Sequence, residues 1–323
     1  MRHKLCAAVC ILLSIVLLAS LAACSESNVG KKKNIAVIVK SEDSEFWKAV
    51  ETGVNAAATE YNVSVTFEGP QNEEDYMTQN KMIESAINRN VDSIIISAID
   101  YNRCSDAISR AAQKGIKIIA IDSTVSSPAV NMFVGTDNYS AGKSAGQACV
   151  ENFSNDEKIC IGIVNYSKDT ENGQRREEGF REYISGVENA EIVGVVNIDS
   201  SVESATFGAL KLLNENPEIN VLVGFNEFMS LGIGNAISQK GLSDSVVGVG
   251  FDSNVNSIEM LESGEMDALV VQNPFAIGYL GIQNAVDLIN GNTKETTVYT
   301  PISLITKENM FDEENQKLLF KFQ

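Results

Sequence analysis

The sequence predicts an α/β protein of two lobes, each built on a doubly wound parallel sheet. Three observations lead to this prediction. The chain has 323 residues, enough for roughly two domains at about 150 residues each. From Asn34 onward, short runs rich in β-branched residues alternate with longer segments of helical period, which is typical of βαβ units. The alternation runs through the first half of the chain and then repeats in the second.

The first half contains four predicted strands separated by helices. The strands are Ile35–Val39, Val63–Phe67, Ser93–Ser97 and Lys117–Ile121. The helices span about residues 45–60, 73–89 and 104–114. Gly115 follows the last of these helices, where glycine readily adopts the left-handed conformation of a C-terminal cap.

The pattern repeats after residues 134–138, where the two lobes are expected to meet. The predicted strands are Lys158–Val164, Glu191–Asn197, Asn220–Gly224, Val246–Gly250 and Ala268–Val271. The predicted helices span about residues 138–152, 172–185, 203–214, 227–240 and 255–263, and Pro217 and Gly241 mark two of their ends. A helix over about 276–290 and short strands around Val298 and at Ile302–Ile305 complete the fold.

The first 24 residues have the pattern of an export signal. Two cationic side chains precede an apolar stretch, which ends in small residues and Cys24. The tetrad Leu-Ala-Ala-Cys24 resembles the bacterial lipobox, in which the cysteine thiolate is the nucleophile that receives the lipid. We therefore expect a signal peptide over residues 1–23 and, over residues 24–33, a lipidated cysteine with a flexible tether. The alternative is an uncleaved anchor helix over Leu5–Ala23. Both interpretations place residues 34–323 outside the cytoplasm.

Composition excludes several classes of function. The chain has 25 Lys+Arg against 43 Asp+Glu, a formal charge of −18, whereas nucleic-acid binding requires a basic face. We therefore expect no nucleic-acid partner. The single histidine is His3, inside the leader. Once the leader is removed, the mature chain has no histidine. Ser-His-Asp catalysis, Cys-His catalysis and histidine-ligated zinc all require one.

The cysteines after Cys24 are Cys104, Cys149 and Cys160. They form an odd set with no Cys-x-x-Cys pair, so the sequence encodes neither a disulfide framework nor a metal site. Cys160 lies in an apolar run, where a buried, inert thiol is expected. A Cys149–Cys160 bridge is the alternative. We expect no metal and no cofactor.

Polar side chains follow the predicted strands, where open parallel sheets bind their ligands. They are Lys40, Ser41, Ser97, Asp122, Ser123, Asn226, Asp252 and Gln272. Carboxylate and amide groups hydrogen-bond in a plane, which suits the neighbouring hydroxyls of a sugar. Phe46 and Trp47, the only tryptophan, offer rings for stacking on the C–H face of a sugar. The alternatives are helix caps for the aspartates and a core position for the two aromatic residues.

Seven motifs, spread over residues 34 to about 306, occur in a characteristic order. They are Ile-Ala-Val-Ile-Val-Lys40 followed by Phe46-Trp47, Ile-Ile-Ala-Ile-Asp122, Val-Gly-Thr-Asp137-Asn-Tyr-Ser-Ala-Gly142, Arg176-Glu-Glu-Gly-Phe180, Gly-Phe-Asn226-Glu-Phe-Met-Ser-Leu-Gly232, Val-Gly-Val-Gly-Phe-Asp252 and Val-Val-Gln272-Asn-Pro-Phe-Ala-Ile-Gly278-Tyr. Together they resemble the ribose-binding-protein group of solute-binding proteins, which have the type I periplasmic binding fold.

The resemblance implies that the chain crosses between the lobes three times, near Asp137, Asn273 and Ser303. An N-terminal lobe would then comprise residues 34–136 and 273–303. A C-terminal lobe and tail would comprise residues 137–272 and 304–323. Closing two lobes over a ligand buries it and moves only a few hinge dihedrals.

The resemblance also implies the ligand contacts. Phe46 and Trp47 would stack on the ligand, and Asp122, Asn226, Asp252 and Gln272 would hydrogen-bond to it. Lys40 resembles a lysine of some pentose binders, and Ser44 stands where the ribose pattern has asparagine. Ser123 and Ser200 replace an arginine and an aromatic residue of that pattern. The family's ligand-binding arginine aligns with Gln174, and of Gln174, Arg175 and Arg176 we prefer Arg175.

The resemblance implies a monomeric, lipid-anchored, extracytoplasmic protein that captures a pentose or hexose and delivers it to the permease of an ABC transporter, without catalytic residues. The alternative is a lipoprotein that presents a sugar or an autoinducer-like molecule to a sensor kinase. A repressor of the same fold needs an N-terminal DNA-binding domain, where this chain has its leader. A dehydrogenase needs Gly-x-Gly-x-x-Gly after the first strand, where this chain has residues 40–45. Asp122 and Asp252 could form a glycosidase pair, but in a binder both accept hydrogen bonds from hydroxyls.

Overall fold

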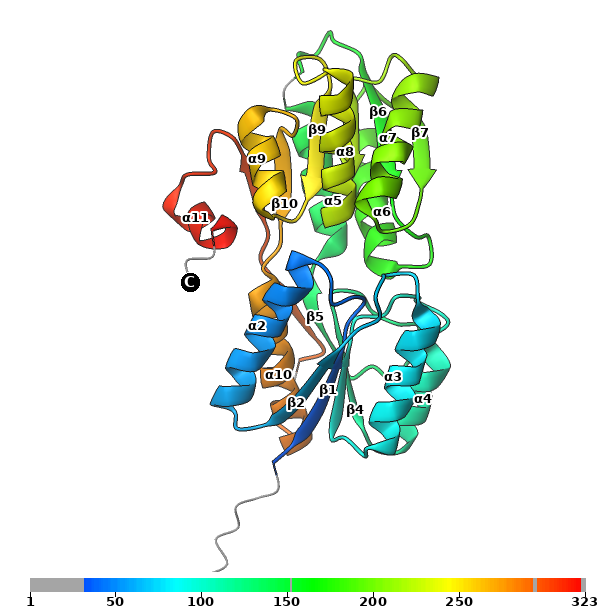
Figure 1. The fold of residues 1–323 in the computed structure, drawn as a ribbon, viewed down its shortest axis with the longest axis vertical. Coiled ribbons are helices and arrows are strands. Elements are labelled where there is room, and N and C mark those ends of the chain that lie inside the picture. The colour runs from blue at the N-terminus through cyan, green and yellow to red at the C-terminus, as the bar shows by residue number, and fades with distance from the viewer. Residues whose placement is uncertain (1–31, 152, 293–294, 321–323) are drawn as a thin grey trace, which may run out of the picture. The chain divides into compact units, whose positions relative to one another are not determined.

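The computed structural model describes residues 32–151, 153–292 and 295–320. In this part of the chain, two six-stranded sheets carry helices on both faces (Figure 1). The predicted fold class of two doubly wound α/β lobes is confirmed. The signal peptide, Cys24 and most of the tether lie outside the described residues. No helix in the described ranges is long and apolar enough to cross a membrane.

The first sheet has the strand order β11-β5-β4-β3-β1-β2, and every neighbouring pair is parallel. Its strands are β1 (Asn34–Ile38), β2 (Ser64–Glu68), β3 (Ser93–Ile96), β4 (Lys117–Ile121), β5 (Met132–Thr136) and β11 (Thr297–Thr300). Its helices are α2 (Glu45–Glu60), α3 (Tyr76–Asn88), α4 (Ser105–Gln113) and α10 (Pro274–Asn290). One apolar core lies under α2 and α10 and a second under α3 and α4.

The second sheet has the order β12-β10-β9-β8-β6-β7, in which only β12 is antiparallel to its neighbour among the described strands. Its strands are β6 (Ile159–Asn165), β7 (Ala190–Asn197), β8 (Val221–Gly224), β9 (Val247–Phe251), β10 (Ala268–Val271) and β12 (Ser303–Thr306). Its helices are α5 (Asn138–Val150), α6 (Glu171–Ser185), α7 (Val202–Glu215), α8 (Glu227–Lys240), α9 (Val255–Ser263) and α11 (Glu313–Leu319). Leu319 anchors α11 to the core of this lobe.

The strand β5 is absent from the predicted elements. Its sequence is short and contains Gly135, which weakens the strand pattern. Pairing with β4 on one side and β11 on the other holds it in the sheet. Gly135 is required there, because a Cβ at this position would lie 3.0 Å from the backbone nitrogen of Asp122. Tertiary contacts, and not the local sequence pattern, therefore determine that this segment forms a strand.

The chain passes between the sheets three times. The crossings lie between β5 and α5, between β10 and α10, and between β11 and β12. At the first two, the connecting residue caps the next helix: Asp137 accepts a hydrogen bond from the nitrogen of Ser140, and Asn273 accepts one from that of Ala276. Each of these connections is short.

The three described cysteines are free and buried. The Cys149–Cys160 bridge is therefore wrong, and the expectation of a buried thiol at Cys160 is confirmed. Burial raises the pKa of the Cys104 thiol to about 11 and that of Cys149 further. Protonated thiols in apolar surroundings are poor nucleophiles.

Candidate ligand-binding site

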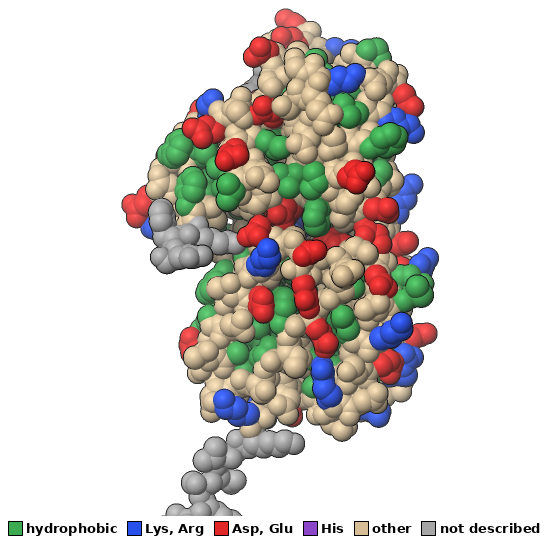
Figure 2. All heavy atoms as spheres, viewed as in Figure 1, with side chains coloured by type: hydrophobic (Ala, Val, Ile, Leu, Met, Phe, Trp, Pro, Cys, Tyr) green, Lys and Arg blue, Asp and Glu red, His purple; other side chains and the backbone are tan. Residues whose placement is uncertain are grey.

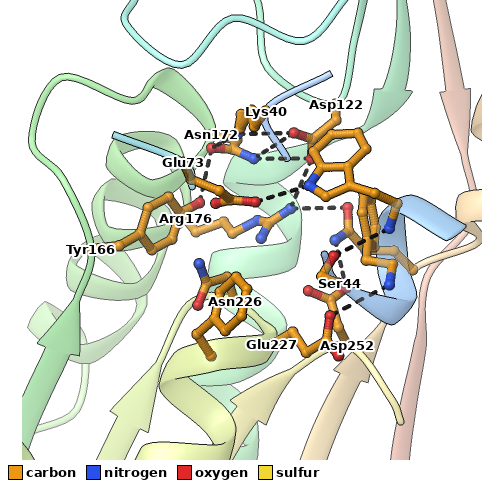
Figure 3. A pocket seen from close by; sticks show the side chains of 14 residues that line it. Lys40, Ser44, Glu73, Asp122, Tyr166, Asn172, Arg176, Asn226, Glu227 and Asp252 are labelled. Carbon is orange, nitrogen blue, oxygen red and sulfur yellow. Dashed lines mark hydrogen bonds and ion pairs between the residues drawn. The ribbon is translucent and has the colours of Figure 1, made fainter. Parts of the chain in front are cut away.

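A cavity of about 30 Å³ lies where the carboxyl ends of the two sheets face each other (Figure 3). Side chains from both lobes line it: Lys40, Ser44, Phe46, Trp47, Glu73, Asp122, Tyr166, Asn172, Arg176, Asn226, Glu227, Phe228, Asp252 and Gln272. The volume is well below the range for small-molecule sites, about 300 to 1,000 Å³. Eight of the nine predicted ligand-binding positions are among these residues, and Arg175 is the exception.

Asp122 and Asp252 stand one residue beyond β4 and β9, and both have left-handed backbone, with φ of 58° and 64°. Aspartate tolerates this conformation better than most residues. Neither aspartate caps a helix, because the caps of α5 and α9 are Asp137 and Asn254. Their carboxylates line the cavity instead.

Asp122 is the centre of a buried charged network. Its carboxylate lies 3.0 Å from the Nζ of Lys40 and accepts hydrogen bonds from Ser97 and from the amide of Asn172. Burial by itself raises the pKa of Asp122, but the charges of Lys40 and Arg176 outweigh it and hold the pKa below its ordinary value. Asp122 is therefore ionised at neutral pH. Because Asn172 belongs to the second lobe, the network also joins the two lobes.

Arg176 lies on the opposite lobe from Asp122 and is 1% exposed. Its guanidinium donates to Asn138 Oδ1 at 2.8 Å, to the carbonyl of Phe225 at 2.7 Å and to Gln272 Oε1 at 2.9 Å. Its Cζ stacks 4.6 Å from the centre of the Phe251 ring. These contacts fix the planar group at the cavity wall.

The preference for Arg175 is wrong. Its side chain is 45% exposed, pairs with Glu178 and lies over the ring of Tyr139. Successive residues of an α-helix point about 100° apart, so only one of two neighbouring arginines faces the cavity. The sequence held the deciding signal, because Arg176 shares a helix face with Asn172 and Phe180, which are both buried.

A close approach of two helices positions Arg176. A Cβ at Gly142 of α5 would lie 2.0 Å from the carbonyl oxygen of Arg176, and a Cβ at Gly179 of α6 would lie 2.0 Å from that of Tyr139. No residue larger than glycine fits at either position without moving a helix. The two glycines thereby bring the α6 backbone against α5.

Phe46 and Trp47 fit both roles considered for them, a core position and a ligand contact. They belong to the apolar core of the first lobe and also line the cavity. Their rings meet edge to face, with centroids 4.9 Å apart. Ser44 caps α2 by accepting a hydrogen bond from the nitrogen of Trp47. The indole of Trp47 donates to Glu73 Oε1 at 2.9 Å.

The second lobe supplies aromatic groups that the sequence analysis missed. Ser200 replaces the second-lobe aromatic residue of the ribose pattern, and Tyr166 and Phe228 line the cavity. Tyr166 is the first residue beyond β6, so the rule that ligands bind at strand ends could have found it. The other missed residues are Glu73, Asn172, Arg176 and Glu227. Glu227 directly follows the predicted Asn226, which caps α8.

Besides Asp122, the carboxylates of Asp252 and Glu227 line the cavity. Asp252 accepts from Gln272 Nε2 at 2.7 Å, and Glu227 accepts from Asn254 Nδ2 at 2.7 Å. Burial raises the pKa of Asp252 to about 7 and raises that of Glu227 above its ordinary value. Near neutral pH, Asp252 can therefore accept or donate a hydrogen bond.

Aromatic rings and planar hydrogen-bonding groups thus enclose one small cavity from two hinged lobes. This fold and site define a binding protein of two lobes, not an enzyme. The chain belongs to the periplasmic binding protein domain family, whose model matches residues 35–293. The resemblance to ribose-binding proteins is confirmed.

Individual relatives agree with this assignment. The chain is 27% identical over 289 residues to the D-ribose/D-allose-binding protein of Pseudomonas aeruginosa, covering 85% of this chain and 89% of that protein. It is 30% identical to a solute-binding protein of an Agrobacterium vitis ABC transporter solved with D-fucose, with a TM-score of 0.85 over 89% of this chain and 100% of that one. It is 29% identical to a carbohydrate transporter solute-binding protein of Agrobacterium radiobacter solved with D-arabinose, with a TM-score of 0.86 over 90% and 99%.

Proposed function

We propose that this chain captures a monosaccharide between its two lobes and delivers it to the permease of an ABC transporter. The observation that carries the proposal is the lining of the cavity. Phe46 and Trp47 offer apolar rings, while Asp122, Arg176 and Asn226 offer planar hydrogen-bonding groups. A sugar needs both kinds of surface, because its ring carries C–H groups on its faces and hydroxyls on its edge.

The relatives support a monosaccharide as the ligand class. The three relatives above are named for, or were solved with, ribose, allose, fucose and arabinose. All of them are pentoses or hexoses. Ser44, Ser123 and Ser200 depart from the ribose pattern, so ribose itself is not specified.

Titrating the full chain with single sugars tests binding. Trp47 is the only tryptophan and lines the cavity, so intrinsic fluorescence reports on the site directly. We expect at least one monosaccharide to change the emission with micromolar or tighter affinity. A complete panel of pentoses and hexoses without any saturable change contradicts the proposal.

The proposal includes a lipid anchor at Cys24 and a monomeric protein outside the cytoplasm. Its support is the sequence pattern of residues 1–24. In cells fed a labelled fatty acid, the chain should carry the label and sediment with membranes, while a Cys24→Ser variant should do neither. Equal labelling of both forms contradicts the anchor. Loss of labelled-sugar uptake on deletion of the gene tests the transport role, whereas unchanged uptake favours the sensor alternative.

A further inference from the structure

The charged side chains of the cavity are unevenly distributed. They belong to Lys40, Glu73, Asp122, Arg176, Glu227 and Asp252, which makes four carboxylates against two cations. Both cations lie near Asp122, with Lys40 Nζ at 3.0 Å and an Arg176 nitrogen at 3.8 Å. Figure 3 shows Lys40 and Asp122 on one side of the site and Glu227 with Asp252 on the other.

The remaining carboxylates form no ion pair with any described residue. Glu73 accepts from the Trp47 indole, Glu227 from the Asn254 amide and Asp252 from the Gln272 amide. These donors are neutral. The charge of Arg176 also acts on Asp252, but burial outweighs it and leaves the pKa of that carboxyl raised. Lys48, near the start of α2, instead pairs with Glu45 at 2.9 Å.

Buried charge without a counter-charge is unfavourable, since a low-dielectric surrounding strengthens repulsion between like charges. Glu227 is 8% exposed and Asp252 is 7% exposed. Burial, together with repulsion from Glu73, raises the pKa of Glu227. A cationic group placed between these side chains removes this cost, and a neutral sugar does not.

Within the described residues, no group of three or more His, Cys, Asp or Glu side chains could hold a metal. A protonated amine needs no such cage, because its three N–H donors can each meet a separate acceptor. Asp252, Glu227 and Asn226 all line the cavity and carry side-chain oxygens, of which Asn226 Oδ1 already accepts from the nitrogen of Met229.

We propose that the preferred ligand is an amino sugar, a monosaccharide whose protonated amine lies beside Glu227 and Asp252. Its hydroxyls face Lys40, Asp122 and Arg176 on the opposite side. This inference rests on the proposed function, and it names the chemical class of ligand at that same site. Figure 2 shows further Asp and Glu side chains gathered across the middle of the visible face, where the two lobes meet. Acidic groups around a cleft attract a cationic ligand toward it.

Pairs of ligands that differ only at one substituent test the inference. Glucosamine, galactosamine and mannosamine are compared at pH 7 with glucose, galactose and mannose by fluorescence titration of the full chain. We expect at least one amino sugar to bind about tenfold or more tightly than its neutral parent. Neutral parents that bind as tightly as their amino forms overturn the inference and leave sugar binding intact. If no sugar of the six, nor ribose, allose, arabinose or fucose, binds, the proposed function fails too.

Protein variants test whether Glu227 supplies the selectivity. Glu227→Gln keeps the shape and the acceptor oxygen for Asn254, and it should lower the ratio of amino-sugar to neutral-sugar affinity at least about fivefold. Glu203→Gln makes the same change of charge on the exposed face of α7 and should leave the ratio unchanged. Asp252→Asn provides a second variant if Glu227→Gln does not fold, and its ratio should fall as well. An unchanged ratio in the folded pocket variant contradicts the inference.

Discussion

Asp122 and Asp252 occupy equivalent positions in the two lobes, yet their environments favour opposite protonation states. Each follows the fourth strand from one edge of its sheet, and each has left-handed backbone. Lys40 and Arg176 hold the pKa of Asp122 below its ordinary value, whereas burial raises the pKa of Asp252 to about 7. One half of the cavity is therefore fixed in charge near neutral pH, and the other half titrates.

Because its pKa is raised, Asp252 should make the free energy of unfolding depend on pH. Its pKa is raised in the folded state, so the stabilisation is complete below the unfolded pKa of about 3.9 and is lost as pH rises toward 7. Without ligand, the free energy of unfolding should fall by about 2 kcal/mol more in the wild type than in Asp252→Asn between pH 5 and pH 7. Urea unfolding at the two pH values measures this. Parallel pH profiles for the two proteins would contradict the assignment.

The two neighbouring arginines should behave differently. Arg176→Lys loses the planar group that contacts Asn138, Phe225 and Gln272, so sugar affinity should fall at least about tenfold. Arg175→Lys changes an exposed ion pair and a contact with the Tyr139 ring, both outside the cavity, and affinity should stay within about twofold. Fluorescence titration of both variants measures the difference. Equal losses of sugar affinity in the two variants would contradict the assignment of Arg176, and not Arg175, to the cavity face of α6.

The contact between α5 and α6 predicts a stability effect at Gly142. A methyl group there would lie 2.0 Å from the carbonyl oxygen of Arg176, so Gly142→Ala should lower the free energy of unfolding by about 1 to 3 kcal/mol. Gly281→Ala in α10 is the matched control, since its methyl group would lie 3.4 Å or more from its neighbours. It should be neutral or stabilise by up to about 1 kcal/mol. Urea denaturation measures both, and a Gly142→Ala variant as stable as Gly281→Ala would contradict the packing.

The hydrogen bonds between the lobes predict the effect of loosening closure. Thr170 of the second lobe donates to the carbonyl of Ile99 at 3.1 Å, and both groups are buried. Thr170→Val keeps the shape and removes this bond, so the open form should gain population and sugar affinity should fall by about 3- to 15-fold. The exposed Thr52 bonds only within α2, and Thr52→Val should leave affinity unchanged. Identical affinities for Thr170→Val and the wild type would exclude this contact from closure.

Much of the fold could be predicted from the sequence because its signals are local and repeated. Apolar β-branched runs mark β1, β3 and β4, and their four to five residues match the predicted strands to within one residue at each end. The strand β5 was missed because its five residues include Gly135 and because one of its two pairing partners, β11, is remote in sequence. Strand-end polar residues placed Asp122 and Asp252 at the cavity for the same local reason.

The rest of the site depends on geometry that the sequence does not express. Glu73 reaches the cavity from a loop through its bond to the Trp47 indole, and no periodicity marks it. Asn172, on α6 of the second lobe, joins the site because its Oδ1 lies 3.1 Å from the Nζ of Lys40 in the first lobe. The choice between Arg175 and Arg176 depended on helix phase, where an error of one residue turns the side chain by about 100°.

The central claim is that a single sugar is enclosed between the two lobes. A crystal structure of the chain grown with the sugar that binds most tightly tests it most directly. The account predicts electron density for one monosaccharide ring against Phe46 and Trp47, with its hydroxyls within hydrogen-bond distance of Asp122, Arg176 and Asn226. A sugar bound on the outer surface of either lobe, with this cavity empty, would contradict it.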